Sequence, residues 1–363
     1  MSFAPDITEK QARARADLRM GVPIVLSYGG ESGGILANAV ETLSADRLAA
    51  VQALTPDAVI AITARRAKTL KARAYDGDLA RIVLPVETGL SWVQAVADPA
   101  DDLRTPMKGP LTTLRDGNVT AHRAALVLAK AARLLPAVLC ALLPDAVGFA
   151  KTHGLTLIRA EDVGSPDVSP LSPIISARLP LMVSEAGRLH VFRPEDGAEE
   201  HYAVEIGKPD RSKPVLSRLH SACFTGDLLG SLKCDCGPQL RGALSAMGKE
   251  GQGVLLYLNQ EGRGIGLANK MRAYALQDQG FDTVEANHRL GFEDDERDFR
   301  IGAEILKRMG FSTVRLLTNN PAKIARMEAE GIAVSERVPL KVGETDENAA
   351  YLATKAAKSG HLL

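Results

Sequence analysis

Little in this sequence would suit an exported, membrane-spanning or nucleic-acid-coating protein. It has 363 residues but only four cysteines and one tryptophan, and aromatic residues make up 4% of it. The 44 Lys and Arg residues balance 44 Asp and Glu residues, so the formal net charge is zero. A neutral chain lacks the field that draws in nucleic acid or an acidic membrane. No uncharged apolar run reaches the ~20 residues of a membrane span. We therefore expect no nucleic-acid or membrane partner, although a local basic cluster could bind one anionic ligand.

The N-terminus shows no export signal. Its first residues, MSFAPDITEKQARARADLRM, lack the apolar stretch of a signal peptide. In the reducing cytoplasm, clustered cysteines bind metal more often than they form disulfides. We therefore expect a cytoplasmic protein in which clustered thiols serve a metal.

Length and patterning predict two α/β (α+β) domains. A chain of this size with 45% hydrophobic residues can bury two cores. Pro and Ser gather in GSPDVSPLSPIISARLP, and we take 166–180 as a linker. On both sides, strand-like apolar runs alternate with helical patterns, such as AHRAALVLAKAARLL at 121–135. The predicted domains are therefore 1–165 and 181–363.

Three of the four cysteines fall in one short window. Cys223, Cys234 and Cys236 lie in HSACFTGDLLGSLKCDCG, whereas Cys140 lies in the apolar run AVLCALL and is expected in a core. A disulfide between positions i and i+2 is strained, so a shared metal is the better use of the three thiols. They could hold a zinc ion with an open fourth position for reactive water, or form a structural site with a distant fourth ligand such as His220. The spacing alone leaves both interpretations open.

Two further segments could bind phosphate. In NQEGRGIGLANK, residues 259–270, three glycines precede a predicted helix whose first amides could cradle a phosphate beside Arg263. A simple turn is the alternative, and the P-loop pattern is absent. In LLTNNPAK, residues 316–323, a buried strand ends before a helix, where α/β folds place ligand contacts, and Lys323 could reach an anion. There the alternative is an ordinary turn with a helix N-cap.

An acidic run, GFEDDERDFR at 291–300, also has two interpretations. Such a run is usually a solvated helix start. The functional interpretation makes Asp295 a general base and places Arg297 near a phosphate. Two histidines lie near these motifs, His220 and His288, and each could equally pack or react.

Together these motifs carry a family resemblance. The region from about Arg218 to Leu363 closely resembles GTP cyclohydrolase II, the first committed enzyme of riboflavin synthesis. The shared segments, in order, are HSACFTGD, SLKCDCG, LNQEGRGIGLANKMRAYALQDQGFDTVEANH, DDERDF, RLLTNNPAK, ERVPL and the tail GHLL. Because they span the whole C-terminal half, the resemblance favours the catalytic over the structural zinc site.

The resemblance implies site residues one by one. The family's zinc ligands fall on Cys223, Cys234 and Cys236, and its catalytic residues on Asp295 as proton acceptor, Arg297 as nucleophile and Tyr274. One departure is Ala222, where some members carry glutamate, which puts one substrate contact in doubt. The implied substrate contacts are Arg218, Leu219, His220, Ser221, Ala222, Gln239, Glu261, Gly262, Arg263, Thr283, Thr318 and Lys323.

The resemblance also implies the reaction. GTP would bind through its triphosphate with Mg²⁺, and one Zn²⁺ per chain would supply hydroxide for attack on C8 of guanine. The products would be formate, pyrophosphate and 2,5-diamino-6-(5-phospho-ribosylamino)pyrimidin-4(3H)-one. Covalent attack by Arg297 on the α-phosphorus would be unusual, because a guanidinium with a pKa near ~12.5 is a poor nucleophile. Stabilising transition-state charge is the plainer role. The resembling families are usually dimers, so a homodimer is expected.

The N-terminal half resembles 3,4-dihydroxy-2-butanone 4-phosphate synthase in the order of its segments but not in its catalytic signatures. The family's acidic loop, DDEDRENEGD, is here LSYGGESGGI, which keeps only Glu31. Its Pro-Gly-His motif appears as Pro106-Met107-Lys108, and its His-Thr-Glu motif falls near His122 and Arg123. That chemistry needs several bases and a divalent metal. We therefore expect an inactive domain that serves dimerisation, solubility or regulation.

Two alternatives stay open at this point. One is a bifunctional riboflavin enzyme with an active synthase domain, against which the lost acidic loop argues. The other is a homologue that binds GTP for regulation or acts in pyrimidine metabolism, for which Ala222 leaves room.

Overall fold

A computed structural model describes residues 3–29, 32–105, 108–164, 169–345 and 348. The chain forms two compact units. The first comprises residues 1–167 together with 268–296, and the second comprises residues 168–267 together with 297–363. Each unit has its own sheet, which confirms the prediction of a two-part α/β protein.

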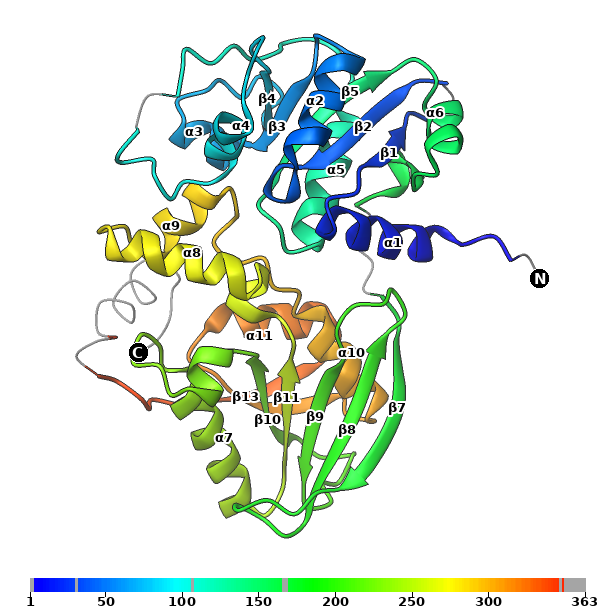
Figure 1. The fold of residues 1–363 in the computed structure, drawn as a ribbon. Helices are drawn as coiled ribbons and strands as arrows, with labels where there is room; N and C mark the ends of the chain where they lie inside the picture. Colours follow the sequence, from blue (N-terminus) through cyan, green and yellow to red (C-terminus); the bar gives the residue numbers. More distant parts are fainter. Residues whose placement is uncertain (1–2, 30–31, 106–107, 165–168, 346–347, 349–363) are drawn as a thin grey trace. The chain divides into compact units, whose positions relative to one another are not determined.

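The first unit is built on a six-stranded sheet in the order β4-β3-β5-β2-β1-β6 (Figure 1). All neighbours pair antiparallel except β1 and β6. Its elements are α1 (Ile7–Arg19), β1 (Ile24–Ser27), β2 (Gly34–Ala39), α2 (Ala45–Leu54), β3 (Val59–Thr63), α3 (Ala64–Thr69), β4 (Leu79–Val83), α4 (Leu90–Ala97), α5 (Thr120–Ala131), β5 (Ala137–Leu143), α6 (Ala146–His153), β6 (Leu157–Arg159), α8 (Leu267–Asp278, which begins one residue before the unit boundary) and α9 (Thr283–Leu290).

Strand periodicity divides the residues of this sheet between its two faces. Side chains alternate along a strand, so Ile35, Ala37 and Ala39 of β2 share one face. That face joins α1 and α5 in a single apolar core. Cys140 of β5 lies in the same core, and burial raises the pKa of its thiol to about 12. It is a packing residue, as expected.

The segment 268–296 is fixed within the first unit by polar contacts along its length. Thr63 Oγ1 donates to the Gly291 carbonyl at 2.8 Å, and Lys130 Nζ contacts Glu296 Oε1 at 2.6 Å. Asn269 Nδ2 donates to the carbonyl of Arg133 at 3.0 Å. This segment therefore belongs to that unit, although the sequence places it far from residues 1–167.

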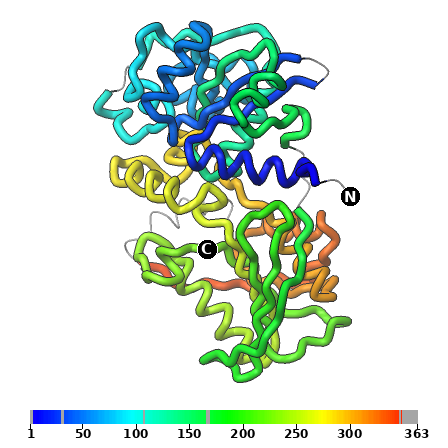
Figure 2. Tube along the Cα trace, turned by 45° about the vertical axis from the view of Figure 1, so that its right-hand side comes forward, coloured from blue at the N-terminus to red at the C-terminus, as the bar shows by residue number. Residues whose placement is uncertain are grey.

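The second unit is built on a seven-stranded sheet in the order β13-β12-β10-β11-β9-β8-β7. Strands β10 to β13 pair parallel, and β7, β8 and β9 add an antiparallel part whose strands follow one another in the trace of Figure 2. Its elements are β7 (Leu171–Arg178), β8 (Gly187–Pro194), β9 (His201–Ile206), β10 (Val215–Ser221), the π-helix η3 (Phe224–Leu228), α7 (Cys236–Glu250), β11 (Gly253–Leu258), the 3₁₀ turn η4 (Glu261–Gly264), α10 (Arg300–Arg308), β12 (Thr313–Leu317), α11 (Pro321–Ala329) and β13 (Ala333–Val338). Strand β7 lies within the segment 166–180, expected as a linker.

Helices cover both faces of the parallel part. Leu219 of β10 packs with residues of α10 and α11, whereas Leu216 of the same strand packs with α7. Parallel strands buried on both faces read as continuous apolar runs, and β11 shows this in GVLLYL. The carboxyl ends of β10, β11 and β12 meet at one sheet edge, where open α/β sheets bind ligands.

Among the described residues, no helix is long and apolar enough to cross a membrane.

Candidate active site

The three clustered cysteines converge beyond the end of β10. Cys223 follows that strand, Cys234 lies in the next turn and Cys236 begins α7. Their sulfur atoms all lie within 4.8 Å of one another, and the Sγ atoms of Cys223 and Cys234 are 3.7 Å apart. Two thiolates on a tetrahedral zinc with bonds of ~2.3 Å would be ~3.8 Å apart. The donor set and its spacing are therefore compatible with zinc.

The close approach of the cysteine sulfur atoms depends on two glycines. A Cβ on Gly226 would meet Cys234 Sγ at 2.7 Å and Cys223 Sγ at 3.0 Å. A Cβ on Gly237 would meet the Gly226 carbonyl oxygen at 2.1 Å. Any side chain at either position would force the sulfur atoms or the backbone that carries them apart.

Asp227 anchors this loop to the sheet. Its carboxylate oxygens accept hydrogen bonds from the Cys223 backbone amide and the Tyr257 hydroxyl and contact Nε2 of His220. Each donor–acceptor distance is 3.0 Å. The ring of His220 also stacks on Tyr257, with centroids 5.6 Å apart. Within the described residues, His220 is not part of the group that could hold a metal. The structure thus gives His220 a positioning contact and does not support it as the distant fourth ligand.

Two of the three thiols, those of Cys234 and Cys236, resist ionisation. The pKa of Cys236 lies well above its usual value because Cys223 and Cys234 hydrogen bond to it and because it is buried. The hydrogen bond from Cys223 is also the largest cause that raises the pKa of Cys234. Three adjacent thiolates repel one another, and a divalent cation would remove that penalty.

A buried arginine lies beside the cysteines on β10. Arg218 donates from Nη1 to the Leu317 carbonyl at 2.9 Å and from Nη2 to Gln239 Oε1, and Gln239 donates in turn to Asp235. Burial lowers the pKa of Arg218 to about 10, so the guanidinium stays charged at neutral pH. Its Nε is the only buried side-chain donor in the described part of the second unit without a hydrogen-bond partner.

The glycine-rich turn after β11 is fastened by the carboxylate of Glu261. Its Oε2 accepts the Phe224 amide at 2.6 Å, and its Oε1 accepts the Gly262 amide at 2.9 Å. Gly262 and Arg263 both adopt left-handed backbone conformations, with φ of 63° and 60°. That conformation is uncommon for arginine and is typical of residues held in place at functional sites. Glu261 therefore joins the turn to the cysteine loop.

The segment after the acidic run is held by Gln260. Its Oε1 accepts the Asp298 amide at 2.7 Å, and its Nε2 donates to the Asp298 carbonyl at 2.8 Å. This places Arg297 so that its Nη1 donates to Ser221 Oγ at 3.3 Å. Its guanidinium also lies 4.9 Å from the ring centroid of Phe299. Arg297 therefore lies at the carboxyl end of β10, near the cysteines.

The TNNPAK segment is a helix N-cap that also places a lysine. Asn320 accepts the Ala322 amide at 3.0 Å, and Thr318 Oγ1 accepts the Asn320 amide at 3.0 Å. The buried Lys323 donates from Nζ to the Leu219 carbonyl at 3.1 Å and lies 5.2 Å from the Phe299 ring. The structure thus shows the helix N-cap that was the alternative interpretation of this segment, and the reach of Lys323 to an anion stays a prediction.

Three predicted site residues lie in the first unit. Tyr274 is on α8, with Lys270 Nζ 5.7 Å from its ring, and Thr283 begins α9, where its hydroxyl accepts from Gln277 Nε2 at 3.1 Å. Asp295 lies between α9 and α10.

The acidic run around Asp295 is largely paired. Glu293 contacts Arg65 at 2.7 Å, and the hydrogen bond from Arg65 lowers the pKa of that carboxyl. His288 Nε2 contacts Asp294 Oδ1 at 2.6 Å. Most of this run therefore serves the packing of the first unit.

In the second unit the structure gathers the remaining predicted residues around the ends of β10, β11 and β12. They are Arg218, Leu219, His220, Ser221, Ala222, Cys223, Cys234, Cys236, Gln239, Glu261, Gly262, Arg263, Arg297, Thr318 and Lys323.

Sequence reasoning missed the residues that position this group. Asp227, Tyr257 and Phe299 each contact a predicted site residue, and Gln260 holds Asp298 next to Arg297, but none of the four was among the candidates. Asp227 offered a signal, because it is the only acid between Cys223 and Cys234 in an otherwise apolar and small-residue run. Gln260 contacts Asp298 across 38 positions, and Phe299 contacts Lys323 of a later helix, which spacing does not reveal.

The residues at the predicted synthase signature positions make structural contacts where the structure describes them. Lys108 pairs with Asp102, and Arg123 contacts Asp78 at 2.6 Å. His122 is buried, and burial lowers its pKa to about 4, so it is neutral. Glu31, Pro106 and Met107 lie outside the described residues, as does the GHLL tail.

Comparisons with known proteins agree with this geometry. The GTP cyclohydrolase II family model matches residues 173–339. GTP cyclohydrolase-2 of Azospirillum brasilense is 44% identical over 359 residues, which cover 97% of this chain and 93% of that protein. GTP cyclohydrolase-2 of Proteus mirabilis is 61% identical over 165 residues, which cover 46% of this chain and 83% of that protein.

A solved structure of a two-domain 3,4-dihydroxy-2-butanone 4-phosphate synthase from A. baumannii aligns over 90% of this chain and 99% of that one. Its sequence identity is 16% and the TM-score is 0.33, a similarity too low to carry an argument.

A sulfur trio at the carboxyl edge of parallel strands, surrounded by buried cations, together with similarity along nearly the whole chain, defines an enzyme. The chain belongs to the GTP cyclohydrolase II family.

Proposed function

We propose that this enzyme hydrolyses GTP to 2,5-diamino-6-(5-phospho-ribosylamino)pyrimidin-4(3H)-one, formate and pyrophosphate, the first committed step of riboflavin biosynthesis. The observation that carries the proposal is the trio of sulfur atoms within 4.8 Å of one another at the end of β10. The names of the relatives give the same substrate.

Cys223, Cys234 and Cys236 would hold one zinc ion through their thiolates. When bound, zinc with an open fourth position lowers the pKa of a coordinated water to ~7 and so provides a nucleophile for the imidazole ring of guanine. Asp227 and Gly226 hold the loop in which the three sulfur atoms converge.

The basic groups around the edge would bind the triphosphate. Arg263 lies in a turn of backbone amides, and Lys323 and Arg297 both lie near the ring of Phe299. These groups compensate phosphate charge in a partly buried setting, where charge-assisted hydrogen bonds are strong. Mg²⁺ would accompany GTP and neutralise part of the triphosphate charge beside these basic groups.

Arg297 stabilises charge at the α-phosphate in this proposal. Its guanidinium already donates to Ser221 and faces an aromatic ring, an arrangement that suits a fixed cation better than a deprotonated nucleophile. Asp295 is the proposed proton acceptor and Tyr274 a proposed active-site residue. The other proposed substrate contacts are Arg218 to Ala222, Gln239, Glu261, Gly262, Thr283 and Thr318.

The first unit would have no synthase activity. The signature positions that the structure describes form ion pairs with Asp78 and Asp102 or hold a neutral histidine, and none of them offers a free base. We propose that the chain works in the cytoplasm as a homodimer. We also propose that residues 181–363 contain the groups that bind zinc and phosphate.

The test is a product assay on the full chain. Incubation with GTP should release formate and pyrophosphate, and mass analysis should find the diaminopyrimidinone phosphate. A zinc chelator should stop formate release, and zinc should restore it. Return of unchanged GTP would favour a regulatory GTP binder, and butanone phosphate made from ribulose 5-phosphate would show a bifunctional enzyme.

Cys234→Ser should lower formate release by about 10³-fold or more, because loss of the metal removes several kcal/mol of catalysis. Metal analysis of the same protein should find little zinc. The matched control is Cys140→Ala, which removes a thiol from the core of the first unit and should keep both zinc and activity. Full activity of Cys234→Ser without zinc would refute the metal's role.

A further inference from the structure

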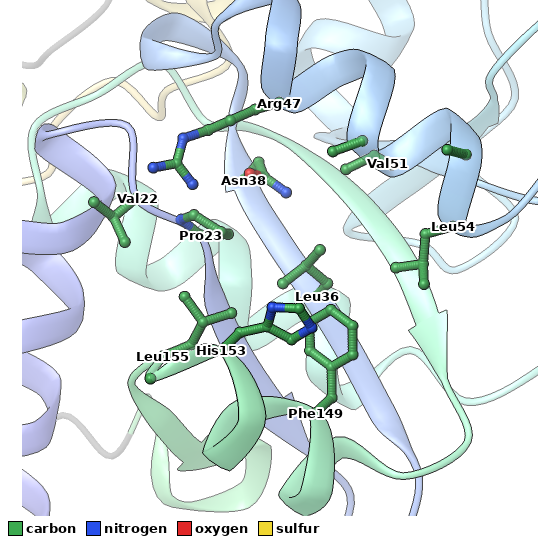
Figure 3. Close-up of a pocket in the computed structure, with 13 residues that line it drawn as sticks. Val22, Pro23, Leu36, Asn38, Arg47, Val51, Leu54, Phe149, His153 and Leu155 are labelled. Atoms are coloured by element: carbon green, nitrogen blue, oxygen red, sulfur yellow. The ribbon is translucent and has the colours of Figure 1, made fainter.

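The first unit contains a cavity that the proposed reaction does not use. Its volume is ≈ 630 Å³, within the range of small-molecule sites. Leu36 and Asn38 of β2 form part of its wall, together with residues of α2 and α6 (Figure 3). Because side chains alternate along β2, these two residues face away from the core shared with α1 and α5. The cavity therefore lies on the other face of that sheet.

Asn38 is the unusual member of this wall. Its side chain is 3% exposed, yet neither Nδ2 nor Oδ1 has a hydrogen-bond partner among the described residues. The other buried side-chain amides in the described parts of the chain have hydrogen-bond partners. Asn319, for example, exchanges two hydrogen bonds with the backbone of Leu340 at 2.7 and 2.9 Å. An amide buried without a partner is destabilising and calls for an explanation, which a bound ligand would supply.

The surroundings of Asn38 indicate the chemistry of that ligand. Arg47 of α2 extends toward the same part of the cavity in Figure 3, and within the described residues its guanidinium makes no ion pair. The rest of the wall is mainly apolar, with Leu54 on one side and the rings of Phe149 and His153 on another. Those two rings have centroids 4.3 Å apart. The lining thus combines an apolar surface, one imidazole, one amide and one cation.

No carboxylate lines the cavity. Chemistry on a sugar phosphate would need acidic groups for a divalent metal or for proton transfer. The lining therefore suits binding and not reaction.

We propose that this cavity binds a small heteroaromatic anion. Its ring would lie against Phe149 and Leu54, and its edge would offer an adjacent donor and acceptor to the amide of Asn38. An asparagine amide can pair with such an edge through two parallel hydrogen bonds, as it does with adenine. A phosphate or carboxylate on the ligand would pair with Arg47. The ligand would act as an effector or a structural ligand of the first unit, independently of the zinc site.

Equilibrium dialysis on the full chain tests this, with AMP and FMN as probes. Both have a heteroaromatic ring with a donor–acceptor edge and a phosphate. At least one should bind. Leu54→Trp fills the cavity from a position that is 42% exposed, so the protein should still fold, and binding should be lost. Because nucleotides could also enter the zinc site, only binding that Leu54→Trp removes counts as binding to the cavity.

Two polar variants test the assigned contacts. Asn38→Leu should weaken binding by about tenfold or more, the usual effect of losing a bidentate amide pair. Arg47→Gln should weaken it by roughly 3–10-fold and reduce its dependence on salt. The matched control is Arg19→Gln, on an exposed position of α1, which should change nothing. Formate release from GTP should be unchanged in all of these variants and confirms that each has folded.

Three results would overturn the proposal. One is that neither probe shows binding that Leu54→Trp removes. Another is that Asn38→Leu binds the probe as well as the parent protein, which would make the cavity merely apolar; the apolar anion 8-anilinonaphthalene-1-sulfonate, which lacks the edge, gives the comparison. The third is that Leu54→Trp changes the sedimentation of the protein, because then a second copy of the chain covers the cavity.

Discussion

The edge of parallel strands in the second unit and the cavity in the first unit treat polar groups in opposite ways. At the edge, Asp227, Glu261 and Gln260 each make two or more hydrogen bonds that hold a loop in place. In the cavity, both polar atoms of Asn38 are unpaired. The first arrangement fixes a site before any ligand arrives, whereas the second gains its hydrogen bonds only when something binds. Sequence motifs alone would have pointed only to the strand edge of the second unit and not to the cavity.

After Cys234→Ser, the largest effect should come from Arg297 at the edge. Arg297→Ala should lower kcat for formate release by about 10²–10³-fold, the usual loss when one charge-stabilising donor is removed. Arg326→Ala is a matched control, because Arg326 also lies 4.9 Å from the Phe299 ring but has no hydrogen bond to Ser221. Steady-state kinetics on both variants gives the answer. Equal losses would mean that Arg297 acts only through the aromatic contact.

The next largest effect is expected at a buried ion pair of the first unit. This pair stabilises the fold and takes no part in the proposed reaction. Arg66 Nη2 donates to Asp102 Oδ1 at 3.0 Å, and both side chains are at most 9% exposed. Asp102→Asn should lower the free energy of unfolding by about 3 kcal/mol, because it leaves a buried cation without its counter-charge. Denaturant unfolding measures this, and GTP hydrolysis by the remaining folded protein should not change.

The Arg66–Asp102 pair also makes the stability of the folded protein depend on pH. Burial raises the pKa of Asp102, but hydrogen bonds and charge from Arg66 and Lys108 outweigh it, so the pKa lies below its usual value. A lowered carboxyl pKa contributes stability that is complete above the unfolded value of ~3.9 and is lost as the pH falls toward the folded value. Unfolding curves should therefore show acid destabilisation that Asp102→Asn reduces. Identical acid profiles would exclude this pair as a source.

A smaller effect is expected at Asp227. Asp227→Asn keeps the shape of the side chain but removes the charge that orients Cys223 and His220, so zinc affinity should fall by about 10–100-fold. Competition with a metal indicator measures it. Excess zinc should restore most of the activity, whereas a residue that acts in the chemical step would not be rescued by metal.

The smallest predicted effect is a gain in stability and not a loss. Asn38→Leu should raise the free energy of unfolding of the ligand-free protein by about 1 kcal/mol, because it removes an unsatisfied buried amide. Thermal or denaturant unfolding tests this. A destabilised Asn38→Leu would show that the amide has a partner in solution, such as an ordered water, and would weaken the contrast between the two regions.

The sequence was sufficient for the class of fold and for the sulfur trio. Alternating apolar runs and helical patterns predicted two α/β parts, and close spacing together with reducing surroundings predicted the convergence of Cys223, Cys234 and Cys236. The TNNPAK segment also behaved as its local chemistry predicts, since Asn320 caps α11 and Pro321 begins it. These features depend on neighbours within about a dozen residues.

The contacts that position the site could not be predicted in this way. Gln260 reaches Asp298, and Thr63 reaches Gly291, through pairings set by the packing of whole elements. The unpaired state of Asn38 is equally invisible, because a buried asparagine in a strand is usually satisfied. Such features depend on three-dimensional packing that no local pattern encodes.

The route of the backbone has a practical consequence. It passes from one unit to the other after residues 167, 267 and 296, so a single proteolytic nick near 165 would not release two intact folds. A fragment that begins at residue 168 would carry residues 268–296 without their partners in the first unit, which include the Thr63 hydroxyl, the Arg133 carbonyl and the side chains of Lys130 and Arg65. Shortening this protein to its family-matching half would therefore expose the very stretch that bears Tyr274 and Asp295.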